Sequence, residues 1–132
     1  MRGLHLTADL RGCAATSDVM TAPAALRSAC LAAVAAAGLT AVGELFHRLA
    51  PADARVAAAG ITGVVLLAES HVAVHTWPEL DAATLDVYVC NLGADNSRAA
   101  EALLGALLGA FAPQSIERHA LQRGELSSRI AR

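Results

Sequence analysis

The pattern of apolar and polar positions predicts strands at both ends of the chain and through its middle. In residues 4–10, Leu and Ala alternate with His, Thr and Asp, which is the period of a strand with one buried face. Gly12 follows and is expected to end that strand. The same reasoning predicts five further strands, at residues 42–49, 60–68, 72–76, 84–91 and 114–121.

Two other segments have the apolar spacing of helices. The first is rich in Ala and Leu and ends at Gly38, with Thr21 as the predicted N-cap and Pro23 in the first turn. Residues 50–59, with their Pro, Asp and small side chains, predict a loop, and a polar tail follows residue 121. The second helix follows a capping cluster at residues 95–97 and repeats its apolar residues every three or four positions: Ala100, Leu103, Leu104, Leu107, Leu108 and Phe111.

The resulting order, β-α-β-β-β-β-α-β, predicts an α+β fold. Several connections between strands are too short for parallel crossovers, so the sheet is expected to be mostly antiparallel. Both helices then pack on one face in a two-layer sandwich. Residues 1–132 have the length of a single domain and include no linker-like stretch. A chain this short buries a modest share of its surface, which favours self-association.

Composition narrows the possible partners and cofactors. The net charge is -2 and the basic residues are scattered, so we expect no nucleic-acid partner. No apolar stretch reaches the roughly 20 residues of a membrane span, and the N-terminus does not resemble a signal peptide, so we expect a cytoplasmic protein. Three cysteines without a CxxC spacing indicate at least one free thiol. All ten basic residues are Arg, and the absence of Lys excludes a pyridoxal phosphate Schiff base.

The segment at residues 66–79, LLAESHVAVHTWPE, gathers most of the reactive side chains. A metal site on His71 and His75 requires helical spacing, whereas the β-branched neighbours of both residues favour a strand. A hydrolase with Ser70 as nucleophile lacks the G-x-S-x-G elbow. The structural alternative makes Ser70 a turn residue and Trp77 a core residue. We expect no metal here.

Four segments together resemble the bacterial S-adenosylmethionine decarboxylase proenzyme family: GVVLLAESHVAVHTWPE at 63–79, HLTADLRGC at 5–13, GELFHRL at 43–49 and LDVYVC at 85–90. The combination of AESH and HTWPE at this spacing is specific to that family. The resemblance implies that the chain cleaves itself between Glu69 and Ser70, giving a β chain of residues 1–69 and an α chain of residues 70–132. Ser70 would become a pyruvoyl group, the cofactor. Thr62 would assist this processing with its hydroxyl and His75 would act as the processing base.

The resemblance also assigns the later chemistry. The pyruvoyl carbonyl would form a Schiff base with the amine of S-adenosylmethionine and accept electrons as CO2 leaves. Cys90 would return the proton and Glu79 would bind the ribose hydroxyls. The product would be decarboxylated S-adenosylmethionine, the aminopropyl donor of spermidine biosynthesis, made by a dimer of processed pairs.

Two features leave alternatives open. The family stacks adenine on an aromatic residue, but the nearest equivalents here are Leu49 and Val56, with Phe46 and Trp77 as possible replacements. Relatives with the same processing segment decarboxylate ornithine or arginine, and a non-catalytic dimeric relative is the other alternative. Retention of Ser70, His75 and Cys90 favours an enzyme.

Overall fold

The computed structural model describes residues 1–51 and 59–124, and all statements about structure refer to these residues. Val56, one of the candidate adenine-stacking positions, lies outside the described residues. So do most of the predicted loop and of the polar tail. The elements are β1 (Gly3–Arg11), α1 (Asp18–Thr21), α2 (Pro23–Ala36), β2 (Ala41–Arg48), β3 (Ile61–Leu67), β4 (His71–Trp77), the 3₁₀ turn η1 (Pro78–Leu80), β5 (Ala82–Cys90), α3 (Ser97–Phe111) and β6 (Ser115–Arg123).

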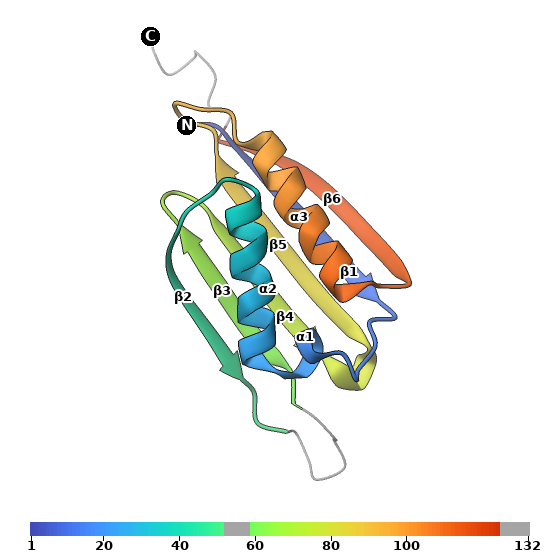
Figure 1. Cartoon of the computed structure of the whole chain (residues 1–132). Coiled ribbons are helices and arrows are strands. Elements are labelled where there is room, and N and C mark those ends of the chain that lie inside the picture. Colours follow the sequence, from blue (N-terminus) through green and yellow to red (C-terminus); the bar gives the residue numbers. More distant parts are fainter. Residues whose placement is uncertain (52–58, 125–132) are drawn as a thin grey trace.

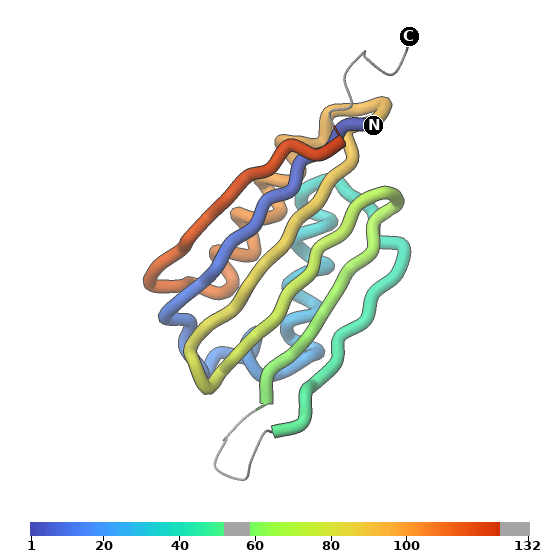
Figure 2. The backbone as a smooth tube through the Cα atoms, turned by 180° about the vertical axis from the view of Figure 1, so that it is seen from behind, coloured from blue at the N-terminus to red at the C-terminus, as the bar shows by residue number. Residues whose placement is uncertain are grey.

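The strands form one sheet in the order β2-β3-β4-β5-β1-β6, and every pairing between neighbours is antiparallel. Helices α2 and α3 lie side by side on one face of this sheet (Figure 1). Figure 2, from behind, shows that no described element covers the other face, which we call the outer face. The predicted α+β two-layer sandwich is therefore confirmed.

Alternation along the strands separates an apolar inner face from a polar outer face. In β1, Leu4, Leu6, Ala8 and Leu10 are buried against the helices, while His5, Thr7, Asp9 and Arg11 point outward. Helix α3 contributes Leu103, Leu104 and Leu107, each fully buried. Burying a large aliphatic side chain stabilises the fold by about 1.5–3 kcal/mol. The helices therefore pack on the apolar face of the sheet, and the polar face stays open.

The start of the first helix differs from the prediction. Thr21 ends the short helix α1 and Ala22, with φ -108° and ψ 108°, is the N-cap of α2. The reason is Pro23, because a residue before proline is pushed out of the helical region and an N-cap needs that extended conformation. Gly38 follows α2 with a φ of 79°, in agreement with its predicted capping role.

The observed ends of two strands also differ by one or two residues from the predicted ends. Strand β6 continues to Arg123, which the sequence pattern left in the polar tail, because every residue of β6 pairs with β1 from Ser115 onward. Strand β5 ends at Cys90, so Asn91 begins the following turn. None of the helices in the described residues has the length and apolar content to cross a membrane.

Candidate active site

Glu69 and Ser70 lie at the tight turn that joins β3 to β4. The Leu67 N–H donates a hydrogen bond to the Ser70 carbonyl at 2.9 Å, and the Ser70 N–H faces the Leu67 carbonyl at 3.5 Å. Ala68 and Glu69 are the only residues between them. Glu69 is exposed, whereas Ser70 is half-buried. The Glu69–Ser70 peptide bond therefore lies where β3 and β4 meet, as predicted from the two flanking strands.

Cys90 lies beside Ser70. Strands β4 and β5 are antiparallel with His71 opposite Tyr88, so the end of β5 runs past the turn. The Cys90 N–H donates a hydrogen bond to Ser70 Oγ at 3.1 Å. Cys90 is 8 % exposed, and the Leu92 N–H approaches its Sγ at 3.4 Å. The fold thus brings together two predicted site residues that are 20 positions apart.

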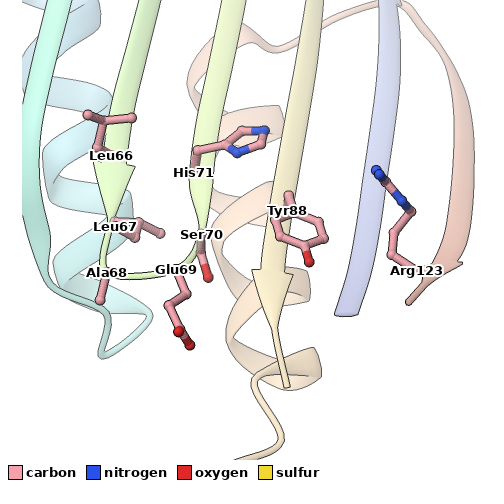
Figure 3. Close-up of a pocket in the computed structure, with 8 residues that line it drawn as sticks. All are labelled: Leu66, Leu67, Ala68, Glu69, Ser70, His71, Tyr88 and Arg123. Atoms are coloured by element: carbon pink, nitrogen blue, oxygen red, sulfur yellow. The ribbon is translucent and has the colours of Figure 1, made fainter. Parts of the chain in front are cut away.

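A pocket of about 380 Å³ opens next to Ser70 on the outer face (Figure 3). Its walls include Tyr88 of β5 and Arg123 of β6, neither of which the motif reasoning singled out. The Arg123 guanidinium carbon lies 5.7 Å from the centre of the Tyr88 ring, an attractive cation–π geometry. Tyr88 lies over Gly3, where an added Cβ would be 2.6 Å from Tyr88 Oη. The sequence does hold one indication for Tyr88: it lies two residues before Cys90 in a strand, so the two side chains are expected on the same face.

His71 forms a small polar cluster with residues of two neighbouring strands. Its ring centre is 5.6 Å from that of Tyr88 and 6.4 Å from that of His5, which itself lies 3.1 Å from an Asp86 oxygen. Burial lowers the pKa of His71 below its ordinary value of 6.5, and the charges of His5 and Arg123 lower it further, against the opposite effect of Asp86. A neutral imidazole therefore borders the Ser70 pocket.

Thr62 and His75 form a second pair, also on the outer face. They are opposite each other in β3 and β4, with Thr62 Oγ1 and His75 Nδ1 at 3.2 Å. His71 and His75 are four residues apart in one strand, so their Cα atoms are roughly 13 Å apart. The strand predicted for both histidines is confirmed. Within one chain, His75 is consequently not placed to act on the Glu69–Ser70 bond.

Glu79 and Trp77 border another pocket, of about 230 Å³, at the end of the sheet opposite the turn. Leu49 lines it as well, and His75 is adjacent, with its ring centre 6.0 Å from that of Trp77. Phe46 lies elsewhere, packed against the core, because Gly63 leaves it room: an added Cβ there would be 2.4 Å from the Phe46 ring. Of the candidate adenine-stacking residues in the described chain, Trp77 and Leu49 line this pocket.

The sequence that builds this site matches a family model. Residues 4–124 match the model described as S-adenosylmethionine decarboxylase. The chain belongs to the S-adenosylmethionine decarboxylase family. The resemblance to this family is thus confirmed, and the matched range spans the positions of Thr62, Ser70, His75, Glu79 and Cys90.

Individual S-adenosylmethionine decarboxylases are similar over most of their length. The proenzyme of Aquifex aeolicus is 38 % identical over 122 residues, covering 92 % of this chain and 81 % of that protein. The Archaeoglobus fulgidus proenzyme is 34 % identical, with 92 % and 97 % covered. The crystal structure of the Aquifex aeolicus adenosylmethionine decarboxylase superposes with a TM-score of 0.81 at 33 % identity, covering 96 % of this chain and 94 % of that one.

Proposed function

We propose that this protein is a self-processing, pyruvoyl-dependent decarboxylase that converts S-adenosylmethionine to decarboxylated S-adenosylmethionine and CO2. Family membership supports the reaction and favours this substrate over ornithine or arginine. The observation that carries the self-processing is the hydrogen bond from the Cys90 N–H to Ser70 Oγ in the turn between β3 and β4. The product is the aminopropyl donor for spermidine biosynthesis.

Processing starts at the Ser70 hydroxyl. Oγ attacks the Glu69 carbonyl carbon, the bond from that carbon to the Ser70 nitrogen breaks, and the peptide becomes an ester. Elimination then releases the Glu69 carboxylate, and hydrolysis of the remaining residue 70 releases ammonia and leaves the pyruvoyl group. Because the Cys90 N–H donates to Oγ, it fixes the direction in which the hydroxyl lone pairs point.

The residues around Ser70 fit a pyruvoyl group. Residue 70 is half-buried beside a pocket of about 380 Å³ that leaves room for a substrate amine. When present, the group supplies a carbonyl that condenses with the amine and withdraws electrons from the breaking carboxylate bond. Cys90 holds the proton that is returned to the substrate α-carbon, since its thiol is buried beside residue 70.

A second copy of the chain is proposed to complete the site. A processing base must reach hydrogen-bond distance of the reacting groups, and His75 lies several strand residues away from Ser70 in its own chain. The pocket beside Ser70, which His71, Tyr88 and Arg123 line, and the Thr62–His75 pair both open on the outer face. That face also exposes Leu45, Leu66 and Leu121 at 68 %, 49 % and 57 %. Packing two outer faces antiparallel would bury these leucines and bring the partner subunit's His75 to Ser70.

The adenosyl part of the substrate is assigned to the Glu79 pocket of that partner. Two carboxylate oxygens suit the two ribose hydroxyls, and the Trp77 indole offers a flat apolar surface for adenine. One substrate molecule would then extend from the Ser70 pocket of one subunit to the Trp77 pocket of the other. This spanning mode also selects the long S-adenosylmethionine over the short ornithine.

We also propose a cytoplasmic location. Cys13, Cys30 and Cys90 are all free thiols. Burial raises the pKa of Cys30 to about 12, so this thiol stays protonated and unreactive. Persistent free thiols are typical of a reducing compartment.

The decisive experiment is mass spectrometry of the purified protein. We expect two pieces, residues 1–69 and 70–132, with pyruvoyl in place of Ser70, and loss of activity on adding phenylhydrazine. Separate incubations with carboxyl-labelled S-adenosylmethionine, ornithine and arginine should release labelled CO2 from the first alone. An intact chain would refute self-processing, and release from ornithine or arginine alone would refute the substrate assignment.

A further inference from the structure

The turn after β5 holds Cys90 through two asparagine side chains. Asn96 Nδ2 donates a hydrogen bond to the Cys90 carbonyl at 2.8 Å. Asn91 Oδ1 accepts the Asn96 N–H at 2.8 Å, and Asn91 Nδ2 donates to Ser97 Oγ at 3.2 Å. The Asn91 N–H in turn donates to the Arg2 carbonyl at 2.7 Å, beside the start of β1. The two amides therefore link Cys90, helix α3 and the sheet.

The orientation of Asn96 distinguishes this arrangement from ordinary helix capping. Asn96 is the N-cap of α3, a position where an Asn side chain normally accepts an N–H of the first helical turn. It makes no such cap hydrogen bond and gives its amide to Cys90 instead. The helix start is served by Asp95, whose Oδ1 accepts the Ser97 N–H at 2.9 Å. Capping thus does not explain the direction of the Asn96 side chain.

Two polar groups of Cys90 stay fixed from outside after Ser70 has been converted. Asn96 holds its carbonyl, and the Leu92 N–H, in the turn that Asn91 closes, points at its Sγ. The hydrogen bond from its N–H to Ser70 Oγ belongs to the uncleaved chain, because Oγ leaves with the Glu69 carboxylate. A proton donor must stay within hydrogen-bond reach of the reacting carbon, and a small displacement costs much of the rate. Cys90 is the last residue of β5, and the pairing with β1 continues beyond it through the Asn91 N–H, which donates to the Arg2 carbonyl. Asn91 therefore also anchors the main chain that follows the thiol.

We propose that Asn91 and Asn96 are positioning residues that hold Cys90 for the return of the proton. This inference rests on the proposed function for its catalytic consequence, while its structural part concerns Cys90 alone. Neither asparagine touches the Ser70 pocket, whose described lining contains neither residue. Both act through Cys90, so the accessibility of its thiol is the first quantity to measure.

The test compares the full-length wild-type protein with Asn96→Ala and Asn96→Asp, and with Asp95→Ala as matched control. Asp95 is next in sequence and caps the same helix, but the bond it provides goes to Ser97. Iodoacetamide labelling of each cysteine is followed by peptide mass spectrometry. We expect Cys90 to react several-fold faster in both Asn96 variants and at the wild-type rate in Asp95→Ala. Cys13 and Cys30, each 0 % exposed, report any general unfolding and should stay unreactive.

Steady-state kinetics form the second readout. In the Asn96 variants kcat should fall several-fold with KM unchanged, because substrate binding is untouched and proton return is impaired. Wild-type labelling of Cys90 in both variants, or equal labelling of all three cysteines, would overturn the proposal. If labelling changes as expected but wild-type protein releases no CO2, the positioning of Cys90 stands and the proposed function fails.

Discussion

The two ends of the outer face carry different sets of the proposed reactive residues. The hairpin end, defined by Ser70 and Cys90, holds the nucleophilic hydroxyl and the thiol beside a pocket of about 380 Å³. The Trp77 end, defined by Thr62, His75, Trp77 and Glu79, holds an imidazole paired with a hydroxyl, an aromatic surface and a carboxylate beside a smaller pocket. Both ends lie on the same strands, yet neither is a complete active site.

The difference shows how a short antiparallel sheet distributes its reactive residues. Cross-strand pairing brings residues together only across the sheet, as with Thr62 and His75, while positions along one strand separate by about 3.3 Å each. A single small domain with one sheet therefore cannot fold its two ends onto each other. A second copy with its outer face turned against the first is the simplest way to unite them.

The largest effect is expected when one chain lacks Ser70 and the other lacks His75, so that each chain keeps only one end intact. Ser70→Ala has no nucleophile, and His75→Ala should slow cleavage by on the order of 10²–10⁴-fold, the usual contribution of a general base. Co-expression of the two variants should restore cleavage of the His75→Ala chain, because its Ser70 then meets an intact His75. A denaturing gel measures the cleaved fraction.

In the matched control, the Ser70→Ala chain is replaced by a chain that lacks both the Ser70 hydroxyl and the His75 imidazole. Co-expression of His75→Ala with the Ser70→Ala/His75→Ala double variant should leave the first chain uncut. Failure of the first mixture to cleave would show that each chain uses its own His75, contrary to the distance along β4.

Cys90 at the hairpin end gives the next largest effect. Cys90→Ser should lower kcat by about 10²-fold, since a hydroxyl is a far weaker proton donor than a thiol. Cleavage at Ser70 should persist, because the hydrogen bond to Oγ comes from the Cys90 main chain and not from its side chain. Gel and CO2-release assays on one preparation separate the two steps. Loss of both steps together would mean that the thiol itself takes part in processing.

Glu79 at the Trp77 end should affect binding more than turnover. Glu79→Gln leaves one of two acceptor oxygens for the ribose hydroxyls, and we expect KM for S-adenosylmethionine to rise by about tenfold with little change in kcat. Self-cleavage should be unaffected, as no substrate is involved. Glu69 cannot serve as control because it is at the cleavage site, so the exposed Asp95→Ala variant is used instead. An unchanged KM would remove Glu79 from the substrate site.

The smallest effect is expected from the pH response of His71. Its pKa is lower in the folded chain than the ordinary 6.5, so the unfolded chain binds more protons as pH falls through that range. Acidification from pH 7.5 should therefore lower the free energy of unfolding, with the loss beginning near pH 6.5 and continuing below it. Urea denaturation should show a shallower pH dependence in His71→Asn. If the free energy of unfolding depends on pH identically in the wild-type protein and in His71→Asn, His71 does not contribute to that dependence.

The sequence pattern predicted the strands well because alternation reports directly which side chains are buried. It placed Leu85, Val87 and Val89 on one face of β5 and Asp86, Tyr88 and Cys90 on the other, as observed. It placed the N-cap at Thr21 instead of Ala22, because Pro23 forces Ala22 out of the helical region and this effect outweighs the weak capping preference of Thr. It missed Arg123 because β6 is exposed along its whole length, so no apolar alternation marks its end.

The candidate site was predictable residue by residue but not as an arrangement. The motif at residues 66–79 and the position of Cys90 supplied the proposed reactive groups, because chemistry restricts which residue types can serve. Nothing in the sequence indicated that Asn96 turns its amide to Cys90, or that Arg123 reaches Tyr88 across β1. These contacts join distant segments through strand pairing.

By itself the sequence determined the fold class and the family, and it supplied the proposed reactive groups, since each depends on local periodicity or on residue type. The tertiary structure alone decided which of those groups are neighbours. Strand register put Ser70 with Cys90 and Thr62 with His75, and the helices, by covering the inner face, left both pairs open to a second copy. Register is a long-range property, fixed by packing the whole core at once.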